Sequence, residues 1–187
     1  MRFLAFPVLV LAAGCYSKPA GPDPAAVAAS EAKAADASDR LGKALMAELT
    51  AALGKGGPAT AVDVCGSVAE RVAAEVSASS GVTARRTSLR VRNPKNAPDP
   101  WEKAILDRWA AGEKPAPVSE VVGGELRQAR PILLKSFCIV CHGGPGEIDP
   151  ATKEAVARRY PGDAATGFKE GDLRGAFSLR VPLRAPR

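Results

Sequence analysis

Histidine is almost absent from this chain of 187 residues, in which His142 is the only one. This excludes a metal site built from several imidazoles, including an iron held between two histidines. Of the four cysteines, only Cys138 and Cys141 form a C-x-x-C pair, so the second half of a zinc site is also missing. We find no acid–base dyad, nucleophile triad or phosphate-binding loop, and therefore expect a protein that is not an enzyme.

Aromatic residues are also few, with two tryptophans and two tyrosines, so a bound macrocycle could supply a large part of the core. The formal net charge is +6, but the basic residues are scattered and no aromatic residues are interleaved with them. No nucleic-acid-binding motif is present, so we expect no nucleic-acid partner. A solvated basic surface is the better interpretation, and it suits an anionic redox partner.

The stretch Cys138-Ile139-Val140-Cys141-His142 has the C-x-x-C-H pattern of covalent haem attachment. Two thiols at this spacing can each form a thioether with one vinyl group, and the histidine can then supply an axial nitrogen to the iron. A disulfide, a zinc half-site and a thioredoxin-like pair are the alternatives. Zinc lacks further ligands, and a thioredoxin-like pair has no need of the histidine. We predict one covalent haem c attached at Cys138 and Cys141, with His142 as the proximal iron ligand.

The first residues have the pattern of an export signal. A basic start is followed by apolar residues 3–13, a run too short to cross a bilayer, and then by Gly14-Cys15. This resembles the cleavage site of bacterial lipoproteins, although Ala12 stands where leucine is more usual. We predict a lipoprotein signal peptide over 1–14, lipidation of Cys15, and a periplasmic location on a bacterial membrane. The alternative is an ordinary signal peptide and a soluble periplasmic protein.

Residues 15–37 are rich in alanine and proline, and we predict a flexible tether there. Residues 38–187 are expected to form one domain. The elements predicted in it are a helix with Leu41, Leu45, Leu49 and Leu53 along one face, a second helix from Pro58, a strand over 82–91, a helix over 101–111, a hairpin over 115–134 that turns at Gly123-Gly124, a helix between Asp149 and Arg159, and a strand over 174–183. No regular alternation of strands and helices appears, so we expect an antiparallel sheet with helices packed on it, an α+β domain.

The second axial position of the predicted haem has few candidates. Met46 lies one residue off the leucine stripe and is expected to face away from the core. Cys65 lies on the apolar face of the second helix and is the one cysteine without another predicted role. It is either an iron ligand or a buried structural cysteine, and an iron with one protein ligand is the third possibility.

Several segments are similar to a family of exported bacterial proteins that carry a single c-type haem in a PAS-like fold. The matching residues are 86–88, 92–98, 101–102, 138–143 and 160–178. The resemblance implies a PAS-like antiparallel sheet with N-terminal helices packed on it. It also implies that Cys65, in Asp63-Val64-Cys65-Gly66, is the second axial ligand. The family occurs as the sensor portion of membrane-bound signalling proteins, but this sequence has no kinase or receptor module after the haem motif.

Three functions remain open. The first is a redox or ligand sensor with a His142/Cys65-ligated haem, whose partner would be a redox protein or a separate signalling protein. The second is a simple periplasmic electron carrier, and the third and weakest is a peroxidase-like haem enzyme. The arginines of residues 86–98 could contact haem propionates, but individually we expect them to be solvated. The loop over 160–171 is expected to be a structural lid beside the haem.

Overall fold

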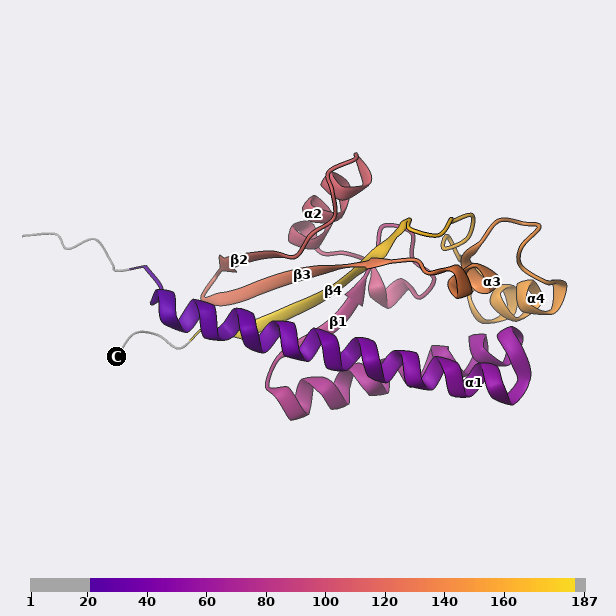
Figure 1. The fold of residues 1–187 in the computed structure, drawn as a ribbon, viewed down its shortest axis with the longest axis horizontal. Helices are drawn as coiled ribbons and strands as arrows, with labels where there is room; N and C mark the ends of the chain where they lie inside the picture. Colours follow the sequence, from indigo (N-terminus) through magenta and orange to yellow (C-terminus); the bar gives the residue numbers. More distant parts are fainter. Residues whose placement is uncertain (1–20, 184–187) are drawn as a thin grey trace, which may run out of the picture.

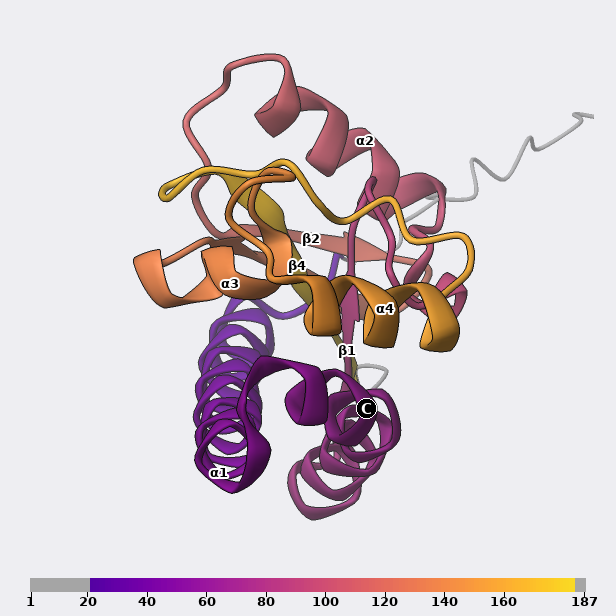
Figure 2. The same cartoon turned by 90° about the vertical axis from the view of Figure 1, so that its right-hand side faces the viewer.

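The computed structural model describes residues 21–183, apart from the side chains of residues 63–65. Its centre is a four-stranded antiparallel sheet in the order β1-β4-β3-β2. The strands are β1 (Thr83–Thr87), β2 (Val118–Val122), β3 (Glu125–Leu133) and β4 (Leu173–Pro182). Helix α1 (Pro24–Ser80) covers one face of the sheet and α2 (Pro100–Ala110) covers the other (Figures 1 and 2). The predicted α+β class with a PAS-like antiparallel sheet is confirmed.

Helix α1 consists of two helical arms joined at Gly56 and Gly57, which have non-helical backbone angles. Gly57 has φ of 71°, a conformation that glycine adopts at low cost. The two arms lie side by side beneath the sheet (Figure 2). Between them and the sheet lies the largest part of the core, which contains Leu41, Val76 and Leu179.

The predicted flexible tether over 15–37 is wrong from residue 24 onwards. Asp23 caps α1 by accepting a hydrogen bond from the Ala25 N–H, and Pro24 occupies the first helical position, where proline is favoured. Alanine has the highest helix propensity, and Ala34 and Ala37 are fully buried. Ala34 and Ala37 are therefore small residues of a helix face that packs on the sheet. Residues 15–20 lie outside the described part of the chain.

The sheet confirms the predicted hairpin. Gly123 and Gly124, with φ of 60° and 82°, join β2 to β3, and both positions have the left-handed conformation that tight hairpin turns favour. Strand β4 pairs with β1 on one side and with β3 on the other. The last strand of the domain is therefore central, which leaves β1 and β2 at the edges.

Helix α2 is held by its capping box, in which Asp99 and Glu102 each accept a hydrogen bond from the other's backbone N–H. Glu102 is fully buried and also accepts two hydrogen bonds from the Arg85 guanidinium of β1. This buried ion pair ties α2 to the first strand. The apolar side of α2 packs Ile105, Leu106 and Trp109 against β3 and β4.

The remaining short elements gather at one end of the sheet (Figure 1). The 3-10 helix η1 (Pro94–Asn96) lies in the loop after β1, while η2 (Ser136–Cys138) and α3 (Ile139–His142) follow β3. Helix α4 (Pro150–Arg159) is capped by Asp149, as predicted, and packs beside α1. Within residues 21–183, no helix has both the length and the apolar content that a membrane span requires.

Candidate functional site

A cavity of about 590 Å³ lies between α1 and the end of the sheet that carries η2 and α3. Its volume falls within the ordinary range for small-molecule and cofactor sites. Apolar side chains supply most of the lining: Leu45, Met46, Leu49, Leu53, Val62 and Val68 from α1, and Pro131, Ile132, Phe137, Val140 and Phe177 from the sheet and the segment after it. The predicted leucine stripe therefore has two roles, since Leu41 packs in the core and the next three leucines face the cavity.

All three functional residues of the C-x-x-C-H motif line this cavity. Cys138 ends η2, and Cys141 and His142 lie in α3, so the motif forms a continuous helical turn. Residues three apart lie on the same side of such a turn, which brings the two thiols to one wall. Cys138 contacts the cluster around Leu134 and Phe168, and Cys141 contacts the cluster around Val62.

The imidazole of His142 is fixed through one nitrogen. Its Nδ1 lies 2.7 Å from the carbonyl oxygen of Ala165. A carbonyl can only accept, so Nδ1 carries the proton and Nε2 keeps its lone pair for a metal. Burial, followed by the positive charges of Arg92 and Arg174, lowers the pKa of His142 to about 3. At neutral pH the imidazole is therefore uncharged, the form that binds metals.

Ala165 belongs to the loop between α4 and β4, which a buried ion pair holds in place. Asp163 accepts two hydrogen bonds from the Arg92 guanidinium, at 3.1 and 3.0 Å, and one from the Ala165 N–H at 2.9 Å. Arg92 also donates to the carbonyl of Cys141 at 2.7 Å. One arginine thus links the C-x-x-C-H motif to the loop that orients its histidine.

The expectation that the arginines are solvated is wrong for Arg92. Its side chain is 12% exposed and that of Asp163 is 8% exposed. Arg86 and Arg174 also line the cavity. Burial, Arg92 and Arg86 lower the pKa of Arg174 to about 10, so this guanidinium stays charged in a crowded cationic environment.

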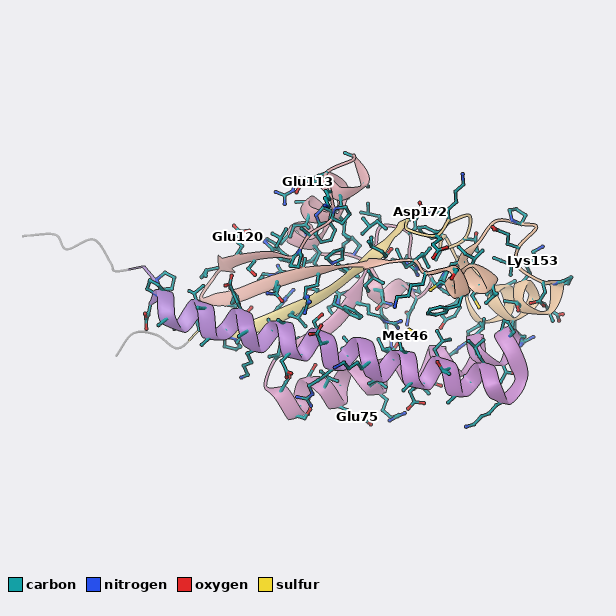
Figure 3. All side chains as sticks on the ribbon, viewed as in Figure 1. Met46, Glu75, Glu113, Glu120, Lys153 and Asp172 are labelled. Carbon is teal, nitrogen blue, oxygen red and sulfur yellow. The ribbon has the colours of Figure 1, made fainter. Side chains whose placement is uncertain are left out.

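The prediction that Met46 faces away from the core needs a correction. Its side chain is 39% exposed, yet it lines the cavity and lies on the side of α1 toward the sheet (Figure 3). The cavity lies between α1 and the C-x-x-C-H motif, so a residue beside the leucine stripe can contribute to its lining.

Two predicted site residues lie outside what the structure describes. Cys15 precedes the described residues, and Cys65 lies in α1 with a side chain that is not described. The residues four and three positions before it, Ala61 and Val62, line the cavity, as do Val68 and Ala69 after it. Both flanks of position 65 thus belong to the cavity wall.

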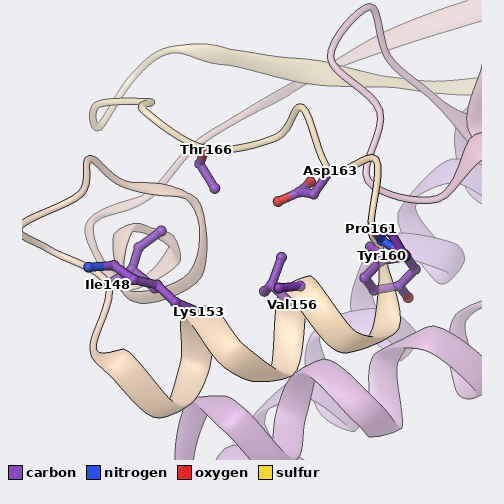
Figure 4. Close-up of a pocket in the computed structure, with 8 residues that line it drawn as sticks. Ile148, Lys153, Val156, Tyr160, Pro161, Asp163 and Thr166 are labelled. Carbon is purple, nitrogen blue, oxygen red and sulfur yellow. The ribbon is translucent and has the colours of Figure 1, made fainter.

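A second cavity, of about 230 Å³, lies between α4 and the following loop (Figure 4). Asp163 and Val156 border it, and no cysteine or histidine does. Among the described side chains, no three of His, Cys, Asp and Glu converge on one point. The donors able to bind a cofactor are therefore those of the larger cavity.

Sequence reasoning found the C-x-x-C-H motif but missed Asp163, Ala165 and Arg174. Each acts across more than 20 residues of sequence, on His142 or on Arg92. The only signal was that all three lie in the long segment 160–178 that resembles the haem family, and this gave them no individual role.

The cavity fits a haem. It has apolar walls for the macrocycle, two thiols at thioether spacing and an imidazole nitrogen that its own hydrogen bond leaves available. Its lining also contains basic side chains, which suit the two carboxylates of a haem. Fold and site together define an α+β protein with a haem-type cofactor cavity at the end of its sheet.

The chain belongs to the Tll0287-like family, whose model matches residues 22–182. This confirms the family resemblance of the sequence. The fold is similar to that of the crystal structure of the cyanobacterial haem protein Tll0287, with a TM-score of 0.62 and 21% sequence identity over 88% of this chain and 99% of that one. A search of curated proteins gave no match.

Proposed function

We propose that this chain is an exported c-type haem protein, held at a bacterial membrane by lipid on Cys15, that acts as a redox or ligand sensor. The observation that carries the proposal is the convergence of Cys138, Cys141 and His142 on one apolar cavity, with Nδ1 of the histidine already hydrogen-bonded. Family membership supports the cofactor, since the related cyanobacterial protein is named as a haem protein. Haem supplies an iron that changes its oxidation state reversibly and has two axial positions.

The chain's own residues determine how such an iron is held. Cys138 and Cys141 would form the two thioethers, and Nε2 of His142 would occupy one axial position. The Ala165 carbonyl fixes the orientation of the imidazole and increases its basicity as a ligand. The apolar walls of the cavity would surround a bound macrocycle and limit its contact with water, a second way in which a protein tunes haem.

The covalent haem is tested by expressing the chain together with a bacterial haem-attachment system. The purified protein should carry one haem that resists acid–acetone extraction and gives the pyridine haemochrome of a haem with two thioethers. Replacing Cys138 and Cys141 with serine should abolish attachment. A haem that is extracted from the unaltered protein would contradict the covalent assignment.

We propose Cys65 as the second axial ligand. Residues three and four positions apart share a helix face, and the neighbours of Cys65 at these spacings on both sides line the cavity. Cys65→Ser should change the absorption and low-spin EPR spectra of the oxidised protein while leaving the haem content unchanged. Met46→Leu is the matched control, because Met46 is the described sulfur-containing side chain on the same wall. A change only in the methionine variant would assign that sulfur as the ligand.

A sensing role requires that an external ligand can reach the iron. We therefore expect carbon monoxide to change the spectrum of the reduced protein. Failure of carbon monoxide to bind would favour the electron carrier. We propose no enzymatic role, because no second histidine exists for acid–base chemistry on the open side. The partner would be a redox protein or a separate signalling protein, and the site gives no indication of its identity.

The lipid anchor and the location have their own test. Cys15→Ala should release the protein from membranes of an expressing bacterium and prevent incorporation of labelled palmitate. Unlabelled, soluble wild-type protein in the periplasm would support the ordinary signal peptide instead.

A further inference from the structure

The cavity has a marked excess of positive charge. Among the described lining residues, the ionised side chains are Arg86, Arg92, Lys135 and Arg174 against one acid, Glu48. That acid already pairs with Arg71 of α1, at 3.0 Å. Lys135 is exposed and the three arginines are partly buried, and Arg92 is paired with Asp163. An apolar cavity with these cations in its lining is suited to a ligand with negatively charged groups.

Arg174 makes its side-chain hydrogen bonds to uncharged groups. Its Nη1 donates to the Ser88 hydroxyl at 2.9 Å and to the Arg90 carbonyl at 3.1 Å, and both acceptors are uncharged. No described carboxylate lies within ion-pair distance of Arg174, and the nearby Asp163 is already paired with Arg92. Arg174 is partly buried, and a guanidinium withdrawn from water in this way gains when an anion pairs with it.

We propose that Arg174, in the positive field of Arg86 and Arg92, is the carboxylate-binding subsite of the cavity and holds the haem propionates. This inference rests on the proposed haem. A guanidinium presents parallel N–H donors that match a carboxylate, and Arg174 has Nη2 and Nε free of the two hydrogen bonds made by Nη1. Arg92 is already engaged with Asp163 and Cys141, so it contributes charge to the subsite.

The test uses the haem-loaded protein and the variants Arg174→Gln and Arg174→Lys. The control is Arg130→Gln, which removes a half-buried arginine of β3 that pairs with Asp39 and does not line the cavity. Haem content is measured first by pyridine haemochrome, and the midpoint potential is then followed against pH by optical titration.

In Arg174→Gln we expect a lower midpoint potential, because a nearby positive charge disfavours the oxidised iron. Its pH dependence should move to higher pH, because a carboxyl that loses its cationic partner has a higher pKa. Arg174→Lys should keep most of the potential, and the control should match the unaltered protein. The subsite is overturned if Arg174→Gln carries full haem and titrates like the control.

A free anion could provide the same chemistry as a propionate, and inorganic phosphate is the probe that separates the two sources. With propionates in place, added phosphate leaves the potential of the unaltered protein unchanged at constant ionic strength. A saturable response to phosphate that disappears in Arg174→Gln would overturn the propionate assignment. A preparation that carries no haem would instead contradict the proposed function, so the two failures are distinguishable.

Discussion

The buried pair between Arg92 and Asp163 gives the most direct test of how the site is built. Asp163→Ala removes the carboxylate that receives two hydrogen bonds from Arg92, and it also removes the acceptor of the Ala165 N–H. Arg92 would be left almost buried without its counter-charge. Losing one partner of such a pair typically costs about 3–5 kcal/mol.

The surroundings of Asp163 indicate a loss of stability at the lower end of that range. Asp163 borders the cavity of about 230 Å³ between α4 and the following loop, where polar groups can hold water that partly solvates the orphaned guanidinium (Figure 4). We therefore expect the free energy of unfolding to fall by about 3 kcal/mol. In a chain of this length, this lowers the melting temperature by roughly 6–12 °C.

The assay is thermal and urea unfolding of the haem-loaded protein, followed by circular dichroism and by haem absorbance. The surface pair of Lys103 and Asp107 on α2 provides the control, and Asp107→Ala should cost less than about 1 kcal/mol. The double variant Arg92→Met/Asp163→Ala should be less destabilised than the sum of the two single variants.

The same substitution has a second consequence at His142. Without Asp163, the Ala165 carbonyl is held less firmly against Nδ1, so the axial imidazole can adopt more orientations. We expect broader low-spin EPR signals in Asp163→Ala than in Asp107→Ala. Equal stability losses in the two variants, with unchanged EPR spectra, would refute the positioning role of this pair.

Three further predictions concern the fold that supports the site. Burial raises the pKa of Asp99, but hydrogen bonds from the α2 backbone and from Arg127 outweigh it and leave that pKa below its usual 3.8. The stability that this carboxylate contributes is present above about pH 4 and is lost as pH falls through the lower folded pKa. Asp99→Asn should therefore make the free energy of unfolding in urea less dependent on pH between about pH 4 and 2. Gly175 has φ of 155° and its Cβ position meets the Thr87 carbonyl, so Gly175→Ala should cost roughly 2–6 kcal/mol by separating β1 from β4, measured by the same unfolding curves. Leu41→Ala, at a fully buried position, should cost roughly 2–5 kcal/mol in protein with and without haem, since it does not line the cavity.

The sequence predicted those elements whose signals are local. Adjacent glycines marked the β2–β3 turn, and Asp149 before a proline marked the start of α4. The same kind of signal was present at Asp23 and Pro24, but the alanine-rich composition that follows suits a linker as well as a helix. The sheet decides between them, because it buries Ala34 and Ala37, and burial across the fold cannot be deduced from composition.

In the site, too, the sequence predicted local features and not those that depend on distant contacts. A contiguous motif such as Cys138 to His142 carries its chemistry in its own spacing. The sequence around Arg174 gives no sign of its role. That role depends on hydrogen bonds to Ser88 and to the Arg90 carbonyl, more than 80 residues earlier, and on a cavity that forms only in the folded chain. Whether an arginine is solvated or buried depends on such contacts, so the sequence could not reveal that Arg92 is largely covered and paired with Asp163.

The cationic lining also resolves an apparent conflict in the site. Buried positive charges destabilise a protein, and Arg174 and Arg92 lie close enough to His142 to lower its pKa. Burial, the larger cause of the lowered pKa, and these charges together keep the imidazole neutral, so that Nε2 retains the lone pair a metal needs. The positive charges that disfavour a protonated histidine would also attract carboxylates, so the same arginines could act on both the axial histidine and the propionates of the proposed haem. Under the proposed function, the arginines near the single histidine would favour its neutral form and would also bind the carboxylates of the cofactor.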